Sequence, residues 1–370
     1  MTVFSRRSPL FGGAVVAVLG VVLAACGSSS KSSSSNTTTA AGGATTTTVK
    51  LAPATLNGSG STFQLAFNQQ AIQEFAQKNP GITINYAGGG STQGLTQLAS
   101  KVTDFAGTDT PITDYTKYGG ETAVLYFPTV VAPITLSYNL SGVSKLTLTA
   151  STAAKIFSGK ITTWNDPAIK SDNPGVSLPG TKITPVHRSD GSGTTKNFTQ
   201  YLSKAAPADW TYPSSTTFPS GLSGGTGNGN PGVAQTVKST PGAIGYVDYS
   251  TATSSNLSLA TIVNAAGKPI QPTLEGASAA VANITANPNL TYDPTDASGA
   301  NAYPITSPTW IVIYKNQTDK AKGEALKAWL NYILTTGQTT TAQAAGYAPL
   351  QGDLLKKAQD QLNEIVIPAQ

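Results

Sequence analysis

The sequence predicts an α/β fold built from two domains. Strand-like segments, glycine-rich loops and helix-like segments follow one another along the chain, which is typical of α/β proteins. The chain has 370 residues, more than a single hydrophobic core usually serves. It has one cysteine, so no disulfide can form within it, and its stability must come from buried cores.

The first 25 residues have the layout of a secretory signal. Arg6 and Arg7 supply the positive start, and an apolar stretch over 11–25 ends in small residues. The triplet 23–25 followed by Cys26 resembles a bacterial lipobox, which implies cleavage before Cys26 and a lipid on that cysteine. The alternative is a cysteine in a short transmembrane helix, but a span needs about 20 apolar residues. We therefore expect a lipoprotein of the cell membrane, anchored on the extracytoplasmic face.

Residues 26–50 are almost all Ser, Thr, Gly, Ala and Asn. Such a composition cannot bury enough apolar surface to fold. It predicts a disordered tether between the lipid and the folded body. No second long apolar run follows, so the body is expected to be only tethered to the membrane.

The charge pattern argues against a nucleic-acid partner. The formal net charge is +5, and about +3 without the first 25 residues. The basic residues are scattered singly and form no cluster interleaved with aromatic residues. A mildly basic protein with few charges is compatible with anion binding but does not by itself predict it.

The first half of the body begins near Leu51 and alternates between helix and strand patterns. Apolar residues recur at helical spacing over 62–78, and Asn79-Pro80-Gly81 ends that helix. Alternation over 82–86 predicts a strand, and a glycine tract then leads to a helix over 92–99. Residues 123–139 are apolar and β-rich, and we expect breaks at Pro128 and Pro133.

The same reasoning applies to the second half. The patterns predict helices over 150–158, 194–204, 233–238, 320–335 and 354–365, with Gly159 closing the first of them. They predict strands over 183–187, 243–247 and 309–314. The glycine-rich stretch 221–231 is expected to be a loop.

Three glycine and serine loops each stand just before a predicted helix, at 58–63, 88–92 and 190–195. A helix N-terminus presents unpaired N–H groups and the positive end of the helix dipole, and glycine lets the backbone approach a ligand closely. Each loop is therefore a plausible anion seat, although each alone is also an ordinary helix cap. Three such loops in one chain, one of them beside Arg188, favour anion binding.

Other kinds of site find little support. No loop ends in Gly-Lys-Ser/Thr, which excludes a nucleotide P-loop, and none has the spacing of a serine hydrolase elbow. His187 is the only histidine, and on a strand it points away from Arg188, which predicts a structural or surface role. With scattered carboxylates we expect no metal site. No cofactor is predicted.

Arg188 and Asp109 are the charged candidates for the site. Arg188 offers planar, bidentate donors to a tetrahedral oxyanion, and Asp190 can hold its guanidinium unless the two form an ordinary surface ion pair. Asp109 follows a predicted strand. In an anion site it can accept a hydrogen bond from phosphate, which keeps a proton near neutral pH, whereas sulfate has none to donate. The alternative is that Asp109 caps the turn at Thr110-Pro111.

Several motifs together are highly specific. They are Gly-Ser-Gly-Ser-Thr-Phe (58–63), the Gly-Gly-Gly-Ser tract (88–91), Asp-Phe-Ala-Gly-Thr-Asp (104–109), Ile-Phe-Ser-Gly-Lys-Ile (156–161) with Trp-Asn-Asp (164–166), Arg-Ser-Asp-Gly-Ser-Gly-Thr (188–194), Pro-Gly-Ala-Ile-Gly-Tyr-Val (241–247) and Pro-Ile-Thr-Ser (304–307). With these motifs the chain closely resembles the phosphate-binding proteins of bacterial high-affinity phosphate ABC transporters, from about Leu56 to Leu350.

The resemblance implies a set of phosphate ligands. They are Thr62, Phe63, Ser91, Asp109, Arg188, Asp190, Ser192, Gly193 and Thr194. The departures are small. His187 stands where the family often has a basic residue, and Thr92-Gln93-Gly94 replaces the usual Ser-Gly-Gly. Ser91 itself is kept.

The resemblance also implies the architecture and the role. It is a fold like that of type II periplasmic binding proteins, with two α/β lobes, two crossovers near 138–139 and 303–304, and the ligand in the cleft. Lobe one then comprises 51–138 and 304–370, and lobe two comprises 139–303. The implied protein is a monomer that closes on inorganic phosphate by a hinge motion and delivers it to the permease subunits of an ABC transporter, without catalysis.

Three other functions stay open at this point. One is a binder of another tetrahedral oxyanion, such as sulfate or molybdate, which a carboxylate at position 109 argues against. Another is a phosphatase on the same scaffold, which needs an activated nucleophile with a base, or metals. The last is a surface antigen or adhesin, which the tether allows.

Overall fold

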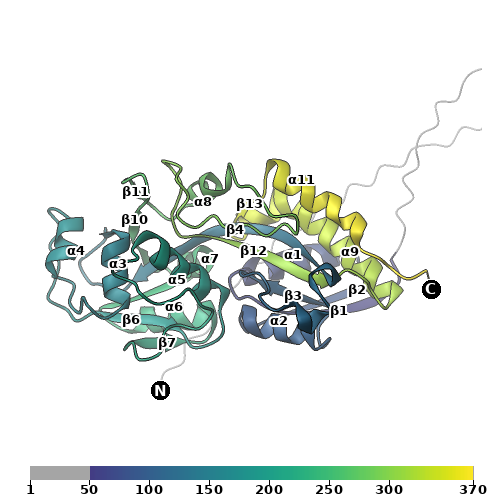
Figure 1. The fold of residues 1–370 in the computed structure, drawn as a ribbon, viewed down its shortest axis with the longest axis horizontal. Coiled ribbons are helices and arrows are strands. Elements are labelled where there is room, and N and C mark those ends of the chain that lie inside the picture. Colours follow the sequence, from purple (N-terminus) through teal and green to yellow (C-terminus); the bar gives the residue numbers. More distant parts are fainter. Residues whose placement is uncertain (1–50, 370) are drawn as a thin grey trace, which may run out of the picture. The chain divides into compact units, whose positions relative to one another are not determined.

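A computed structural model describes residues 51–369 (Figure 1). The predicted signal peptide (1–25), Cys26 and the predicted tether (26–50) lie outside the described residues. Within them, no helix is both long and apolar enough to cross a membrane.

A mixed sheet of ten strands runs through the body. Its main path is β2-β1-β3-β12-β4-β8-β6-β7, with β13 and β9 added along β4. The β1, β2 and β3 strands are parallel, as are β6, β7 and β8, whereas β12 is antiparallel to β3 and β4, and β4 to β8. The bounds are β1 Ala54–Gly60, β2 Ile82–Gly88, β3 Phe105–Thr108, β4 Val124–Tyr138, β6 Thr184–Arg188, β7 Gly225–Gly227, β8 Ala243–Asp248, β9 Ser258–Leu259, β12 Thr306–Tyr314 and β13 Ala348–Pro349.

The long strand β4 belongs to both halves of the protein. Its first part, 124–133, pairs with β12, and its last part, 134–138, pairs with β8. In Figure 1 it runs from the helices around β1 to β3 toward those around β6 to β8. The expected breaks at Pro128 and Pro133 were wrong. On the edge of β4 that meets β13 and β8, pairing covers only 130–131 and 134–138, so neither proline removes a ladder bond there.

The first half carries the helices α1, α2, α9 and α11. The predicted helix over 320–335 is confirmed as α9, whose residues Leu326, Trp329, Leu330 and Ile333 are fully buried. The bounds are α1 Leu65–Lys78, α2 Ser91–Ala99, α9 Lys320–Leu334, α10 Ala342–Ala344 and α11 Gly352–Gln361, with short turns η1 Tyr115–Tyr118, η2 Glu121–Ala123, η3 Gly337–Thr341 and η4 Leu362–Glu364. The first helix starts three residues later than predicted, because the Ser61 hydroxyl holds the amide of Phe63 in a turn.

The second half carries α3 to α8 and a small sheet. The bounds are α3 Ala150–Phe157, α4 Pro167–Asp172, α5 Gly193–Ala205, α6 Gly229–Ser239, α7 Tyr249–Ser254 and α8 Leu274–Val281, and β11 Pro269–Ile270, β10 Thr261–Val263 and β5 Thr147–Leu148 form the sheet. The expected loop over 221–231 was wrong in part, since it contains β7 and the start of α6. Gly227 is required there by packing, because a Cβ would lie 2.2 Å from the amide of Val233.

The fold is thus the two-lobe α/β architecture expected from the sequence. The parallel strands β1 and β3 end beside the start of α2, and β6 ends beside the start of α5. In such sheets the carboxyl ends of the strands are where ligands bind.

Candidate functional site

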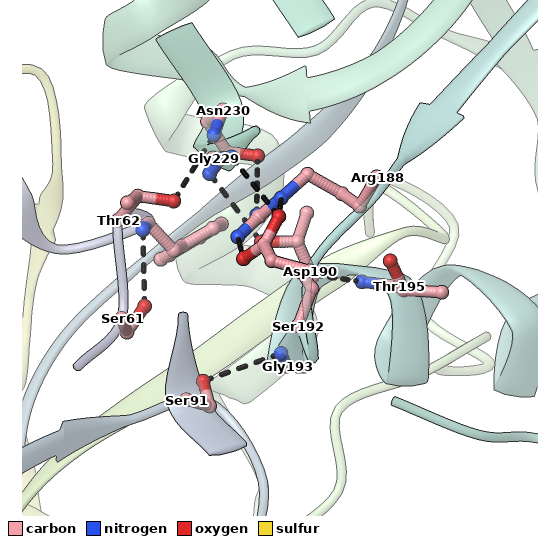
Figure 2. A network of polar contacts seen from close by, with 12 residues as sticks. Ser61, Thr62, Ser91, Arg188, Asp190, Ser192, Gly193, Thr195, Gly229 and Asn230 are labelled. Atoms are coloured by element: carbon pink, nitrogen blue, oxygen red, sulfur yellow. Dashed lines mark hydrogen bonds and ion pairs between the residues drawn. The ribbon is translucent and has the colours of Figure 1, made fainter. Parts of the chain in front are cut away.

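The three glycine loops singled out in the sequence come together at one place. The amides of Gly89 and Gly90 both donate to Gly60 O, at 3.0 and 2.9 Å, which joins the first two loops. The amide of Thr92 donates to Gly191 O at 3.1 Å, which joins the second loop to the third. The helices α2 and α5 therefore begin face to face, one from each half of the protein (Figure 2).

Asp109 is buried at the centre of this junction, with 1% of its surface exposed. Its carboxylate accepts from Ser61 Oγ at 2.6 and 2.7 Å, from Thr309 Oγ1 at 2.7 Å and from Ser91 Oγ at 3.4 Å. Burial raises the pKa of Asp109 to about 6, although these hydroxyls and the Arg188 charge act in the opposite direction. Its side chain is thus held inside the site, and it does not merely cap the following turn.

Arg188, at the end of β6, is 3% exposed, and its charge acts on Asp109. Its Nε donates to Asp190 Oδ1 at 2.7 Å, and one terminal nitrogen contacts Asp190 Oδ2. The other terminal nitrogen donates to Asn230 Oδ1 at 3.1 Å. Burial raises the pKa of Asp190, but the hydrogen bond and charge of Arg188 outweigh it, so the pKa lies below its usual value. This is a buried pair, because only 1% and 10% of the two side chains are exposed.

The remaining predicted residues surround this pair. Thr62 and Phe63 follow β1, and Thr62 Oγ1 accepts from the amide of Asn230 at 3.1 Å (Figure 2). Ser192 caps α5, since its hydroxyl accepts from the amide of Thr195 at 3.1 Å. Thr194 Oγ1 accepts from Asn230 Nδ2 at 3.3 Å. All nine residues predicted for the site therefore lie at one junction.

Sequence reasoning missed several side chains that shape the site. Asn230, fully buried, links Arg188, Thr62 and Thr194. Asn230 lies in the stretch 221–231, which we expected to be a loop. It was missed because the start of α6 at Gly229 was not predicted. Asn197 donates to Asp109 O and to Ser307 Oγ, both at 2.8 Å. The sequence could have singled out Asn197, because a polar residue on the inward face of the predicted helix over 194–204 is expected to have a buried partner.

The sole histidine is not part of this junction. Its ring stacks on Phe218, with centroids 4.4 Å apart and planes 10° apart. Its Nδ1 lies 3.0 Å from Arg188 O. These contacts agree with the structural role expected for His187. Within 51–369, no group of three or more His, Cys, Asp or Glu side chains is placed to hold a metal ion.

Glycine keeps the two halves in contact. Gly90 has a φ of +88°, and a Cβ there would lie 2.4 Å from Asp190 Oδ2 and 2.5 Å from Gly191 O. A Cβ on Gly193 would lie 2.6 Å from Ser91 Oγ and 2.7 Å from Asp109 Cβ. The two halves therefore approach each other closely at Gly90 and Gly193, where a side chain would not fit.

Comparison with known proteins identifies the family. The model of the PBP superfamily domain matches residues 33–336. The phosphate-binding protein PstS 3 of Mycobacterium tuberculosis is 34% identical over 323 residues, covering 84% of this chain and 86% of its own. The phosphate-binding protein PstS of Methanocaldococcus jannaschii is 33% identical over 384 residues, covering 96% and 98%.

Solved structures show the same fold. A periplasmic phosphate-binding protein, PfluDING, bound with phosphate, has a TM-score of 0.69 at 20% identity and covers 86% of this chain and 100% of its own. An ABC-type phosphate transport receptor from Vibrio cholerae has a TM-score of 0.51 at 18% identity, covering 80% and 100%. The superfamily match and the identity to the two relatives show that this chain belongs to the PBP superfamily and, within it, to the family of PstS phosphate-binding proteins.

Proposed function

We propose that this protein binds inorganic phosphate between its two lobes and releases it unchanged. The names of its relatives support this proposal, and so does the chemistry of the junction. Its hydroxyls, main-chain amides and one buried guanidinium suit an anion, and they come from both lobes.

The observation that carries the proposal is the presence of Asp109 and Arg188 in one buried site, where the charge of Arg188 acts on the carboxylate. An anion site that needed only positive charge would gain nothing from a buried carboxylate. A ligand that brings both negative charge and a proton satisfies both groups, because its P–OH donates to Asp109 while its other oxygens accept from Arg188. Phosphate fits this requirement near neutral pH, and sulfate does not.

We assign phosphate contacts to nine residues. They are Thr62, Phe63, Ser91, Asp109, Arg188, Asp190, Ser192, Gly193 and Thr194, with Asp190 acting through the guanidinium that it holds. Support comes from the burial of Asp109, Arg188, Ser192 and Thr194 at 3% exposure or less. It also comes from the contact between Ser91 and Gly193 across the junction.

We also propose the lobe boundaries expected from the sequence, with crossovers near 138–139 and 303–304. The change of partner along β4, from β12 to β8, supports the first of them. The amide of Ile134 donates to Ile305 O at 2.7 Å, so the two connecting strands lie side by side near the second. Bending at this pair of strands would open the cleft.

Delivery to a membrane permease of an ABC importer completes the proposed function. The lipobox-like sequence before Cys26 supports a lipid anchor there and a location on the extracytoplasmic face of the cell membrane. We propose that the protein acts as a monomer, because each lobe supplies its own part of one site.

Catalysis has no support from the side chains of the site. Ser192 Oγ accepts from an amide, and the His187 ring is stacked on Phe218. A phosphatase would need a base beside its nucleophile. We therefore propose a binder that is not an enzyme.

Calorimetric titration of the full-length protein with phosphate and with sulfate tests the proposal. We expect phosphate to bind about 10⁴ times more tightly than sulfate at neutral pH. The Asp109→Ala variant should bind phosphate more weakly and lose most of this preference, whereas Asp114→Ala, on an exposed turn of the same lobe, should keep both. An unchanged preference in Asp109→Ala would contradict the role of this carboxylate.

A further inference from the structure

A chain of buried polar side chains leads to Asp109. It starts at Asn68 on α1 and passes through Gln64 to Thr309 on β12. Gln64, Asn68 and Thr309 are all fully buried. Fully buried polar groups are costly unless each is paired, so the direction of every hydrogen bond in this chain matters.

The Gln64 amide has only one orientation that fits its neighbours. One atom of the amide lies 3.0 Å from the carbonyl oxygen of Trp310, so it must be the nitrogen. The same nitrogen lies 2.7 Å from Thr309 Oγ1 and donates its second proton there. The Gln64 oxygen accepts from Asn68 Nδ2 at 3.2 Å. Thr309 therefore receives a proton from Gln64 and has its own hydroxyl proton left to give.

The Thr309 proton has two acceptors within reach. Asp109 Oδ1 lies at 2.7 Å and the carbonyl oxygen of Thr108 at 3.1 Å. The carboxylate is both nearer and charged, so it is the favoured acceptor. The direction of the Ser61 hydroxyl is determined in the same way. It accepts from the amide of Phe63 at 3.0 Å, so its only proton is donated to Asp109.

From these bonds we infer that Thr309 and Ser61 determine the anion specificity of the site by keeping Asp109 a proton acceptor. This inference rests on the proposed function. Two hydroxyls that donate to a carboxylate stabilise its ionised form. The ionised form accepts the proton of phosphate and repels sulfate, whereas a protonated Asp109 would donate to sulfate and admit it. Thr309 and Ser61 are thus positioning residues that act through Asp109.

The backbone is shaped to place this pair of hydroxyls. The register between β12 and β4 shifts between Pro308 and Trp310, so that Thr309 lies opposite two residues of β4, Thr129 and Val130. Gly107 leaves the space that the chain of polar groups occupies. A Cβ there would lie 2.9 Å from Gln64 Nε2 and 2.0 Å from the Tyr86 hydroxyl.

Four other titratable groups act on Asp109 from the surrounding elements. Arg188 on β6 favours its ionised form. Burial raises the pKa of Asp248, at the end of β8, to about 7, so this carboxyl stays largely neutral at mildly acidic pH. Burial also raises the pKa of Tyr86 and of Tyr347 well above the usual value, so both phenols are neutral. Of these groups, only Arg188 is charged throughout the test range of pH 5 to 8.

The test is the pH at which sulfate begins to compete with phosphate. Because sulfate requires a protonated Asp109, we expect its inhibition constant in the unaltered protein to fall as pH decreases toward about 6. Thr309→Val removes a donor to the ionised form and should move this dependence upward by about one pH unit, so that sulfate competes roughly fivefold better at pH 7. Thr309→Ser keeps the hydroxyl and should restore the original dependence.

Two further variants make the test decisive. Thr129→Val is the matched control. Thr129 is a fully buried residue of β4, and its hydroxyl contacts Thr309 O and not Asp109. This variant should leave the pH dependence of sulfate competition unchanged. Ser61→Ala removes the other close donor, since Ser61 Oγ lies 2.6 Å from the carboxylate and Ser91 Oγ lies 3.4 Å from it. It should act like Thr309→Val, which covers the case in which Thr309→Val does not fold.

The outcomes separate the two proposals. If the unaltered protein does not prefer phosphate to sulfate, the proposed function fails and this inference falls with it. If the unaltered protein prefers phosphate but Thr309→Val and Ser61→Ala both leave the pH dependence of sulfate competition in place, the inference alone is overturned.

Discussion

The hydroxyl of Ser91 accepts a hydrogen bond of 3.2 Å from the main-chain amide of Gly193. This bond joins the first turn of α2 in one lobe to the first turn of α5 in the other. Both helices direct their N-termini at the same point, so their dipoles favour an anion there. The bond can form only while the two lobes are together. It therefore stabilises the closed form, and removing it should weaken ligand binding.

Gly90→Ala is expected to hold the lobes apart. A Cβ at Gly90 would overlap Asp190 Oδ2 and Gly191 O, both of the other lobe. Disfavouring the closed form by about 3 kcal/mol would weaken phosphate binding about 100-fold, as calorimetry would show. Gly119→Ala is the matched control, since Gly119 has a φ of +91° and its Cβ would meet only Ala123 Cβ, at 3.9 Å. Equal affinities in the two variants would show that closure does not depend on this contact.

Asn230→Ala is expected to weaken phosphate binding about tenfold. The change removes the acceptor that holds one terminal nitrogen of Arg188, at 3.1 Å, and hydrogen bonds to charged groups are among the stronger ones. The exposed Asn228, which makes no capping bond to α6, provides the control Asn228→Ala. Should both variants bind phosphate as the unaltered protein does, Asn230 would have no part in orienting the guanidinium.

The ligand-free protein is expected to lose stability as pH rises from about 4 to about 7. Burial raises the pKa of Asp109 to about 6 and that of Asp248 to about 7. In this window the folded protein keeps protons that the unfolded chain has released, so a rising pH favours unfolding. Thermal and urea unfolding at several pH values would measure the effect.

The variant Asp248→Asn isolates the larger contribution to this loss. Asp248 is fully buried, its Oδ1 accepts from Thr251 N at 2.9 Å, and its Oδ2 has no partner among the described residues. A neutral amide removes the cost of ionisation, so above pH 7 the variant should be more stable by an amount on the order of 3 kcal/mol. Asp353→Asn, at an exposed site, is the control. A pH profile identical to that of the unaltered protein would refute this explanation.

His187→Phe is expected to leave phosphate affinity within about twofold, because an aromatic ring at this position keeps the stack on Phe218. His187→Ala should lower the melting temperature while binding stays intact. A tenfold loss of affinity in His187→Phe, measured by calorimetry, would assign the imidazole a direct part in binding that its contacts do not support.

The sequence alone determined the fold class and singled out most of the residues that meet at the junction. Helical spacing identified α9, and the fully buried Leu326 and Trp329 confirm it. The glycine loops marked where helices begin, because glycine and serine are needed at such starts whatever the rest of the fold does. Local signals of this kind are readable without a structure.

Tertiary structure decided what local patterns cannot express. The prolines of β4 predicted breaks, yet the strand continues, because the edge that meets β13 and β8 is unpaired at positions 128 and 133. Asn230 and Thr309 contact Arg188 and Asp109 only because the fold brings α6 and β12 to these two residues. Residues 200 positions apart in the chain share one hydrogen bond there. A local sequence pattern cannot predict a contact between residues so far apart in the chain, because the contact depends on the order of the strands in the sheet.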